Sequence, residues 1–97
     1  MRMDDQLSSH DQPVLRIKVK TAGLLGRYLP EGSARNRAQV RAPRGSTPMA
    51  LIDLLGMPAG GRYLISLNGN IVPIGQRSEV TLSDGDELAI MPALRGG

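Results

Sequence analysis

The sequence has no cysteine, tryptophan or phenylalanine, and it has only two tyrosines among 97 residues. The absence of cysteine excludes a disulfide framework, a thiolate metal site and a cysteine nucleophile. No apolar run approaches the ~20 residues that a membrane-spanning helix needs, so we expect no insertion into a membrane. The polar first residues contain no apolar stretch of signal-peptide length. We therefore expect a cytoplasmic protein.

The length and composition predict one folded domain. A chain of 97 residues buries enough surface for one core but not for two. Its hydrophobic content of 40% is ordinary for a globular protein. We expect a flexible polar tail over residues 1–13, a folded domain over residues 14–92 and a flexible tail over residues 93–97 that ends in Gly-Gly.

The positive charge is carried mainly by arginine and is locally concentrated. The net charge is +3, and four arginines fall within one short stretch: Arg35, Arg37, Arg41 and Arg44. Such a cluster can neutralise phosphates, but single-strand binding usually adds aromatic stacking platforms, which this chain lacks. We therefore interpret the cluster as a solvated loop face that contacts an acidic partner, and we expect no nucleic-acid binding.

Several segments have the patterns of β-strands. Apolar and basic residues alternate from Leu15 to Lys20, which predicts a half-buried strand. A weaker alternation predicts a second strand over residues 38–42. Residues 63–67 are apolar on both faces, as in an interior strand. Asn68-Gly69 favours a tight hairpin turn into a short return strand at residues 71–72, and residues 87–91 predict the last strand.

One helix is predicted with definite ends. Thr47 can cap the first free backbone N–H groups, and Pro48 fits the first helical position. Asp53 marks the solvent side of a wide apolar face formed by Met49, Ala50, Leu51, Ile52, Leu54 and Leu55. Gly56 suits the left-handed residue past the end of the helix.

These elements predict an α+β domain in which a helix packs across a sheet. We expect the first and last strands to pair in parallel at the centre of the sheet. The glycine- and leucine-containing segment from Ala22 to Leu29 should form a turn that places leucines on the core. The expected core consists of Leu15, Ile17, Val19, Leu51, Leu55, Ile65, Leu67, Leu82, Leu88 and Ile90.

Constellations of catalytic or metal-binding residues are nearly absent. His10 is the only histidine and lies in the polar tail, without an ordered partner that would make it a general base. Asp84 and Asp86 flank Gly85, but two carboxylates alone make a poor calcium or magnesium site, so a turn is favoured. We expect no metal, no bound cofactor and no enzyme that acts alone.

The end of the chain has two interpretations. Gly96-Gly97 follows the last strand after a short lead of Ala93, Leu94 and Arg95. The simpler interpretation is a frayed terminus. The alternative is a reactive carboxylate on an arm thin enough to enter a narrow channel of another protein, since glycine has no side chain to obstruct it.

A set of motifs favours the second interpretation. Leu67-Asn68-Gly69, Ile71-Val72-Pro73, the segment from Leu82 to Leu88 and the terminal Gly96-Gly97 together resemble the MoaD/ThiS family of ubiquitin-like sulfur carriers. The resemblance covers roughly residues 14 to 97. It implies a β-grasp fold, with a mixed sheet of four to five strands and one main helix. It also implies that Gly97 is adenylated by a partner and converted to a thiocarboxylate that donates sulfur.

The resemblance further implies three kinds of partner. An adenylating enzyme of the MoeB/ThiF type would consume ATP, a cysteine desulfurase or rhodanese would donate sulfur, and a synthase would accept it. Asn68-Gly69 resembles the carriers of thiamine-thiazole synthesis, whereas Met91-Pro92 resembles the small subunit of molybdopterin synthase. That subunit has aromatic residues where this chain has Ile90 and Met91, so the acceptor stays open, with molybdopterin, tungstopterin and thiamine thiazole as the candidates.

Two other functions fit the same motifs. The chain could be a ubiquitin-like modifier conjugated to lysines through Gly97, or a β-grasp regulatory or binding module. For the carrier, we expect the activating enzyme to dock on the exposed sheet face and on the tail. The expected contact residues are Leu64, Ser66 and Met91, the Arg41 side beside them, and Leu94 and Arg95.

Overall fold

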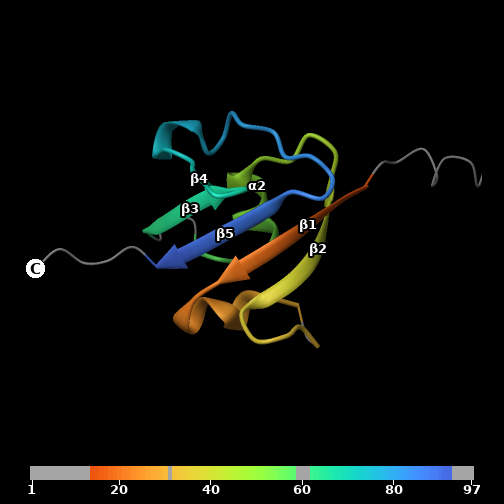
Figure 1. Ribbon diagram of the computed structural model, residues 1–97, viewed down its shortest axis with the longest axis vertical. Coiled ribbons are helices and arrows are strands. Elements are labelled where there is room, and N and C mark those ends of the chain that lie inside the picture. Colours follow the sequence, from red (N-terminus) through yellow and green to blue (C-terminus); the bar gives the residue numbers. More distant parts are fainter. Residues whose placement is uncertain (1–13, 31, 59–61, 93–97) are drawn as a thin grey trace, which may run out of the picture.

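A five-stranded mixed sheet and one α-helix form the domain in the computed structural model, which describes residues 14–30, 32–58 and 62–92. The strands are β1 (Val14–Thr21), β2 (Arg37–Pro43), β3 (Tyr63–Leu67), β4 (Asn70–Ile71) and β5 (Glu87–Pro92). They lie in the order β2-β1-β5-β3-β4 (Figure 1). The helix is α2 (Pro48–Leu54), and two 3₁₀ segments are η1 (Gly23–Tyr28) and η2 (Ile74–Gln76). The tails expected at residues 1–13 and 93–97 lie outside the described residues.

The centre of the sheet is formed by the first and last strands, as expected. β1 and β5 run in parallel, with Val19 opposite Leu88. β5 also pairs with β3 in the antiparallel direction, and β1 pairs with β2. β5 therefore joins a β1–β2 hairpin to a β3–β4 hairpin.

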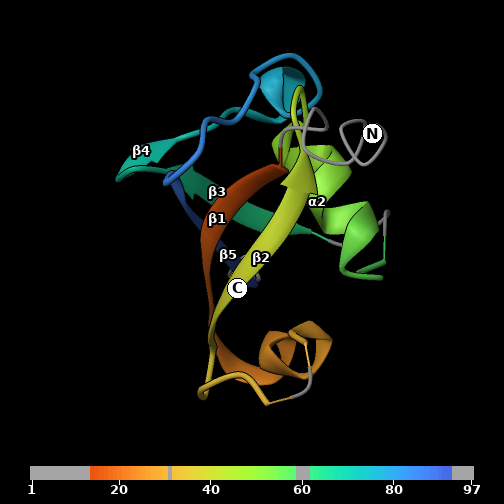
Figure 2. The ribbon, with the colours of Figure 1, turned by 90° about the vertical axis from the view of Figure 1, so that its right-hand side faces the viewer.

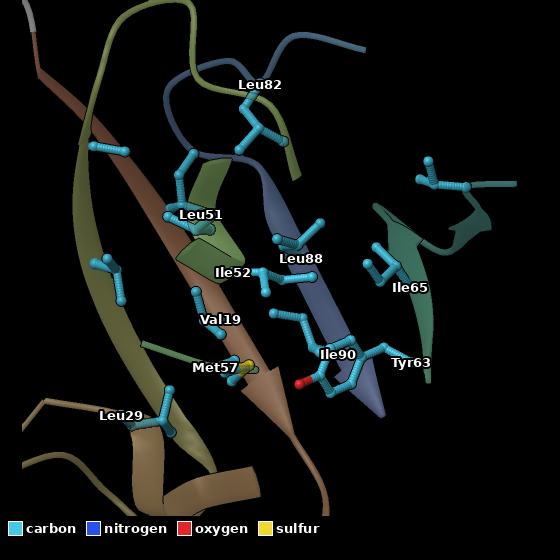
Figure 3. Packing of buried hydrophobic residues seen from close by; sticks show 14 of the residues in the cluster. Val19, Leu29, Leu51, Ile52, Met57, Tyr63, Ile65, Leu82, Leu88 and Ile90 are labelled. Atoms are coloured by element: carbon cyan, nitrogen blue, oxygen red, sulfur yellow. The ribbon is translucent and has the colours of Figure 1, made fainter. Parts of the chain in front are cut away.

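The core lies between the sheet and α2, which with η1 covers one face of the sheet (Figure 2). Alternate residues of the strands point toward the helix, and Ile17, Ile65, Leu88 and Ile90 are fully buried. Leu51 and Ile52 of α2 meet them from the other side (Figure 3). The structure adds seven buried residues to the expected core: Leu29, Val40, Ala42, Ile52, Met57, Tyr63 and Val72.

Two expected core residues are only partly buried. Leu55 follows the last residue of α2, where the chain turns away from the sheet, and Leu67 ends β3 beside the hairpin turn. Both pack against the edge of the core. The inward orientation expected for Leu67 is confirmed, because it pairs with the buried Leu88.

The helix begins and ends as the sequence predicts. The Thr47 hydroxyl accepts a hydrogen bond from the Ala50 N–H at 3.1 Å. Gly56 has a φ of +77°, and the N–H of Met57 reaches back to the Ile52 carbonyl at 3.1 Å. This closure buries Met57 against the helix end. The apolar face is narrower than expected, because Leu54 is 54% exposed.

The segment after β1 forms the 3₁₀ segment η1, and it places only some of its leucines on the core. Residues three apart share a side of a 3₁₀ turn, so Leu25 and Tyr28 pack against the core together. Leu24 points away from it and is 78% exposed. The expectation for Leu24 is therefore wrong.

The predicted hairpin turn is confirmed. Asn68 and Gly69 both have positive φ, 51° and 89°, and Leu67 pairs with Asn70 across them. Consecutive positive φ values define the type I′ turn, which matches the twist of the two strands it joins.

None of the helices among the described residues has the length and apolar character needed to span a bilayer.

Candidate functional site

The predicted reactive end of the chain lies beyond the last described residue. Leu94, Arg95, Gly96 and Gly97 are outside the described residues. The structure fixes where they start, because they follow Pro92 at the end of β5. β5 is paired with a strand on each side, and Ile90, two residues before Pro92, is fully buried. The terminal segment therefore starts from an interior strand of the sheet.

Three predicted contact residues lie together beside this point. Leu64 pairs with Met91 and Ser66 pairs with Ala89, all on the outward face, opposite α2. Leu64 is 48% exposed, and the other three are half-buried. We call these four residues the β3–β5 patch. It is a mainly apolar surface adjoining the residue from which the terminal segment departs.

Arg41, the fourth predicted contact in the described chain, is not part of this group. It pairs with Arg16 near the start of β1, whereas Ala89 pairs with Lys20 near the end of β1. With two strand spacings and a rise of ~3.3 Å per residue, Arg41 lies roughly 20 Å from Met91. Arg37, which pairs with Lys20, is the β2 arginine nearest the patch.

An ion pair that the sequence analysis did not anticipate borders the patch. The Lys20 ammonium lies 2.6 Å from a Glu87 carboxylate oxygen. The hydrogen bond from Lys20 and its charge, with smaller effects of Lys18 and Arg37, lower the pKa of Glu87 below its ordinary value. Alternation alone places Lys20 outward, but its partner depends on the parallel register of β1 and β5.

The Asn-Gly and Asp-Gly-Asp motifs meet in space as a structural clip. One carboxylate oxygen of Asp86 accepts from the Ser83 N–H at 2.7 Å, and the other accepts from the Asn68 amide at 3.0 Å. The Asn68 side-chain oxygen accepts from the Glu87 N–H at 2.9 Å. Asp84 accepts from the Arg16 N–H at 2.7 Å. We call Asn68, Asp84 and Asp86 the turn clip.

The turn clip fastens the start of β5 to β1 and to the β3–β4 hairpin. Its carboxylates are occupied by N–H donors, which supports the turn interpretation of Asp84 and Asp86. Among the described residues, no group of three or more His, Asp or Glu side chains is placed to hold a metal ion. These motif residues therefore fix the geometry from which the terminal segment starts.

Arg77 is a further structural residue without a sequence signal. Its guanidinium donates to the Tyr63 carbonyl at 2.6 Å, and its own carbonyl accepts from the Met49 N–H at 3.0 Å. It thereby ties the segment after β4 to both β3 and α2. An isolated arginine in a polar loop gives no hint of this role.

A protein-family model matches most of the chain. The model of the ThiS family matches residues 31–97. That range includes β2 to β5 and extends to the terminal Gly-Gly. No curated protein sequence matches the chain.

Solved structures show the same fold at low sequence identity. The chain is similar to the HVO 2177 protein of Haloferax volcanii, with a TM-score of 0.72, 16% identity and coverage of 99% of this chain and 94% of that one. It is similar to small archaeal modifier protein 1 of Haloferax volcanii, with a TM-score of 0.60, 20% identity and coverage of 82% and 99%. It is also similar to Urm1 from Trypanosoma brucei, with a TM-score of 0.59, 17% identity and coverage of 87% and 97%. The fold is the ubiquitin-like β-grasp.

Proposed function

The chain belongs to the ThiS family, and from this premise we propose that it is a protein-borne sulfur carrier. The carrying group is the Gly97 carboxylate, which a partner enzyme adenylates and which then becomes a thiocarboxylate. The observation that carries the proposal is the family match through residue 97, which unites the sheet and the terminal Gly-Gly in one pattern. The chain acts as a substrate of its partners rather than as a catalyst.

The chemistry starts from an unreactive group. A terminal carboxyl has a pKa of about 3.3–3.7, so Gly97 is an anion at neutral pH and a poor electrophile. Attack of a carboxylate oxygen on the α-phosphate of ATP forms an acyl-adenylate and releases pyrophosphate. Sulfide then attacks the acyl carbon, AMP leaves with the transferred oxygen, and a thiocarboxylate remains. The partners supply the catalytic groups for both steps.

The described part of the chain contributes recognition and placement. The β3–β5 patch offers apolar surface beside the point of departure of the terminal segment, and such surface often marks protein contacts. In this proposal the activating enzyme, of the MoeB/ThiF type, covers the patch and draws Gly96 and Gly97 into its channel. Leu94 and Arg95 contact the entrance of that channel. Few residues must then be ordered, which keeps the entropic cost of binding modest.

The other partners follow from the same chemistry. A cysteine desulfurase or a rhodanese carries the sulfur as a persulfide. A thiol reduces this persulfide, which releases sulfide to the adenylated chain and leaves a disulfide. The acceptor is a synthase of molybdopterin, tungstopterin or thiamine thiazole. The three acceptors are separated by offering the thiocarboxylated chain to each synthase and following the loss of its sulfur.

The decisive experiment measures exchange of pyrophosphate into ATP with the activating enzyme. One residue appended after Gly97 moves the carboxylate about 3.3–3.6 Å along an extended chain, while reacting atoms must approach to roughly 3–3.5 Å. Gly96→Val keeps the carboxylate in place but adds a branched side chain and stiffens the backbone. We expect both variants to fold normally and to lose exchange.

The product is checked by intact mass. The unaltered chain, incubated with the enzyme, ATP and a sulfur donor, should have one oxygen replaced by sulfur. If the extended chain is adenylated as fast as the unaltered chain, the carrier function is wrong and the regulatory-module alternative takes its place.

A protein modifier is the second candidate function. Its support is the likeness to small archaeal modifier protein 1, whose name states that role for that protein. Activation would be identical, but a lysine amine would displace AMP. A lysine-linked adduct that survives a thiol reductant would favour the modifier, and a terminal sulfur released to a synthase would favour the carrier.

A further inference from the structure

A basic strip covers the half of the outward face that β1 and β2 form, next to the β3–β5 patch. Alternation along β1 and β2 directs its cations outward, opposite α2. The basic strip consists of Arg16, Lys18 and Lys20 on β1 and Arg37 and Arg41 on β2. Arg16 pairs directly with Arg41, and Lys20 pairs directly with Arg37. Like charges opposite each other on neighbouring strands destabilise a sheet.

The register between β1 and β2 brings the two cationic residues of each pair close together. The Arg16 carbonyl accepts from the Gly85 N–H at 2.8 Å, and the Lys18 N–H donates to the Asp86 carbonyl at 2.8 Å. These backbone groups point toward β5, so the residues opposite them on β2 belong to non-hydrogen-bonded pairs. Pairs of that kind bring Cα atoms to about 4.5 Å, closer than the hydrogen-bonded ones. The Cα atoms of Arg16 and Arg41 are therefore close together, with both side chains on the outward face.

Within the described residues, the β1 member of each pair has an acidic partner. Arg16 lies 3.8 Å from an Asp84 carboxylate oxygen, and Lys20 lies 2.6 Å from Glu87. Within residues 14–30, 32–58 and 62–92, neither Arg37 nor Arg41 has a carboxylate within 4 Å. In this part of the chain, the two β2 arginines of the strip thus form no ion pair.

β2 is also an edge strand. It stands at the end of the strand order, with β1 on one side (Figure 1). Since Gln39 and Arg41 are in non-hydrogen-bonded pairs with β1, their N–H and C=O groups face the open edge. Such a row of backbone groups is a template for pairing with another extended chain.

A groove beside the strip adds room for side chains. It has a volume of about 800 Å³. Lys18, Lys20 and Arg37 line it, with Gln39 and Ser33, and Glu87 is the one acidic residue among the described lining residues. The lowered pKa of Glu87, caused mainly by Lys20 and further by Lys18 and Arg37, reflects the positive potential there. The groove is therefore suited to an anionic occupant.

We propose that the β2 edge and the basic strip bind an acidic segment of a partner protein in extended conformation. The segment adds a strand to β2 through the backbone groups of Gln39 and Arg41. Its Asp or Glu residues, at every second position, lie on the outward face beside Arg37 and Arg41. Arg37 and Arg41 are four residues apart, about 13 Å along a strand, which matches acidic residues at positions i and i+4.

The charge pattern favours a protein over a nucleic acid. No aromatic residue lines the groove, and none lies on the strip, so bases would find no stacking platform. Carboxylates spaced along a strand would relieve the like-charge pairs one by one. This site does not depend on activation of Gly97, and it is separate from the β3–β5 patch.

The test uses the whole chain and labelled peptides. A peptide of alternating Glu and Val is compared with a peptide of the same composition arranged as a Glu block and a Val block, and with a single-stranded RNA. Binding is followed by fluorescence anisotropy, and the contact by shifts of the Gln39 and Arg41 amide signals in NMR spectra. A third peptide, N-methylated at alternate positions, removes the donors needed for strand pairing.

The protein variants are matched in charge. Arg37→Gln/Arg41→Gln removes two charges from the strip. The control, Arg35→Gln/Arg44→Gln, removes two charges from exposed positions just outside the same strand. We expect the alternating peptide to bind the first variant about tenfold more weakly and the control almost unchanged. The block and N-methylated peptides should bind weakly to all forms.

Four outcomes of the binding measurements would overturn the proposal. The first is an equal loss of affinity for the alternating peptide in the two double variants, and the second is equal affinity for the alternating and block peptides. The third is tighter binding of the RNA than of the alternating peptide, and the fourth is no binding of that peptide. A dimer of the free protein that dissociates in Arg37→Gln/Arg41→Gln would also overturn it, by assigning the edge to a second copy.

Discussion

The two faces of the sheet are made by alternate residues of the same strands, yet they differ in almost every property. The inward face meets α2 and carries Ile17, Ile65, Leu88 and Ile90, all fully buried. The outward face carries a basic strip on β1 and β2 and a mainly apolar patch on β3 and β5. Neighbouring residues such as Ile90 and Met91 therefore belong to different environments.

Along one strand, residues that stabilise the fold therefore alternate with residues that are available for recognition. Burial of the inward residues stabilises the fold, while the outward residues include like-charge pairs that lower its stability. A substitution on the inward face should therefore change the free energy of unfolding, whereas one at the adjacent outward residue should change binding.

The largest expected effect belongs to the inward face. Ile90→Ala should lower the free energy of unfolding by about 2–5 kcal/mol, because it leaves a cavity at the centre of the core. The adjacent Met91→Ala should change it by less than about 1 kcal/mol. Urea unfolding measures both. Equal losses would show that the two faces are not separable.

The turn clip should show an intermediate effect. Asp86→Ala removes the hydrogen bonds from the Ser83 N–H and the Asn68 amide, and should lower the free energy of unfolding by about 1–3 kcal/mol. Asp53→Ala, on the exposed side of α2, is the control. If both variants unfold at the same urea concentration, the clip contributes nothing to stability.

A smaller effect, on binding alone, is expected for the patch. Leu64→Gln should weaken the complex with the activating enzyme about fivefold, since it removes half-exposed apolar surface. Leu54→Gln is a matched control, because the two leucines are 48% and 54% exposed and lie on different elements. Met91→Asp should weaken the complex further. If a folded Met91→Asp chain were activated at the normal rate, the β3–β5 patch would not be the surface on which the activating enzyme docks.

The smallest effect concerns the ion pair beside the patch. Because Lys20 lowers the pKa of Glu87 below 4.5 in the folded chain, the pair stabilises the fold above that pH. This contribution is lost as the pH falls through the lowered pKa. Glu87→Gln should therefore be less stable than the unaltered chain at pH 6 and should approach it at pH 3. If the difference in unfolding free energy between Glu87→Gln and the unaltered chain grew as the pH fell, the stabilising role of the Lys20–Glu87 pair would be contradicted.

The sequence predicted the fold well wherever a short pattern determines the structure. Alternation identified the inward residues of β1, and Thr47 and Gly56 marked the ends of the helix. Leu24 shows where this fails, because adjacent leucines look alike until the 3₁₀ turn separates them. Met57 was missed because its burial depends on how the chain closes after the helix.

The candidate site was predicted only in part, because its arrangement depends on how strands distant in the sequence pair. Leu64, Ser66 and Met91 come together because β3 and β5 are antiparallel neighbours in the sheet, so alternate residues of both strands share the outward face. Arg41 lies apart from them because the register between strands distant in sequence is not encoded in any one of them. The Lys20–Glu87 pair escaped prediction on the same ground.

The position of β5 also has a consequence for the order of folding. The β3–β4 hairpin pairs residues that are close in sequence, such as Leu67 and Asn70. The β1–β2 pairing is less local, and β5 lies between the two pairs of strands in the sheet. Val19 and Leu88, which pair across the centre, are far apart in the chain, and contacts of this kind form slowly. We therefore expect the insertion of β5 to be a late event of folding. Because Gly97 follows β5 in the sequence, a partner that recognises the sheet and the chain end together should bind only chains that have completed this step.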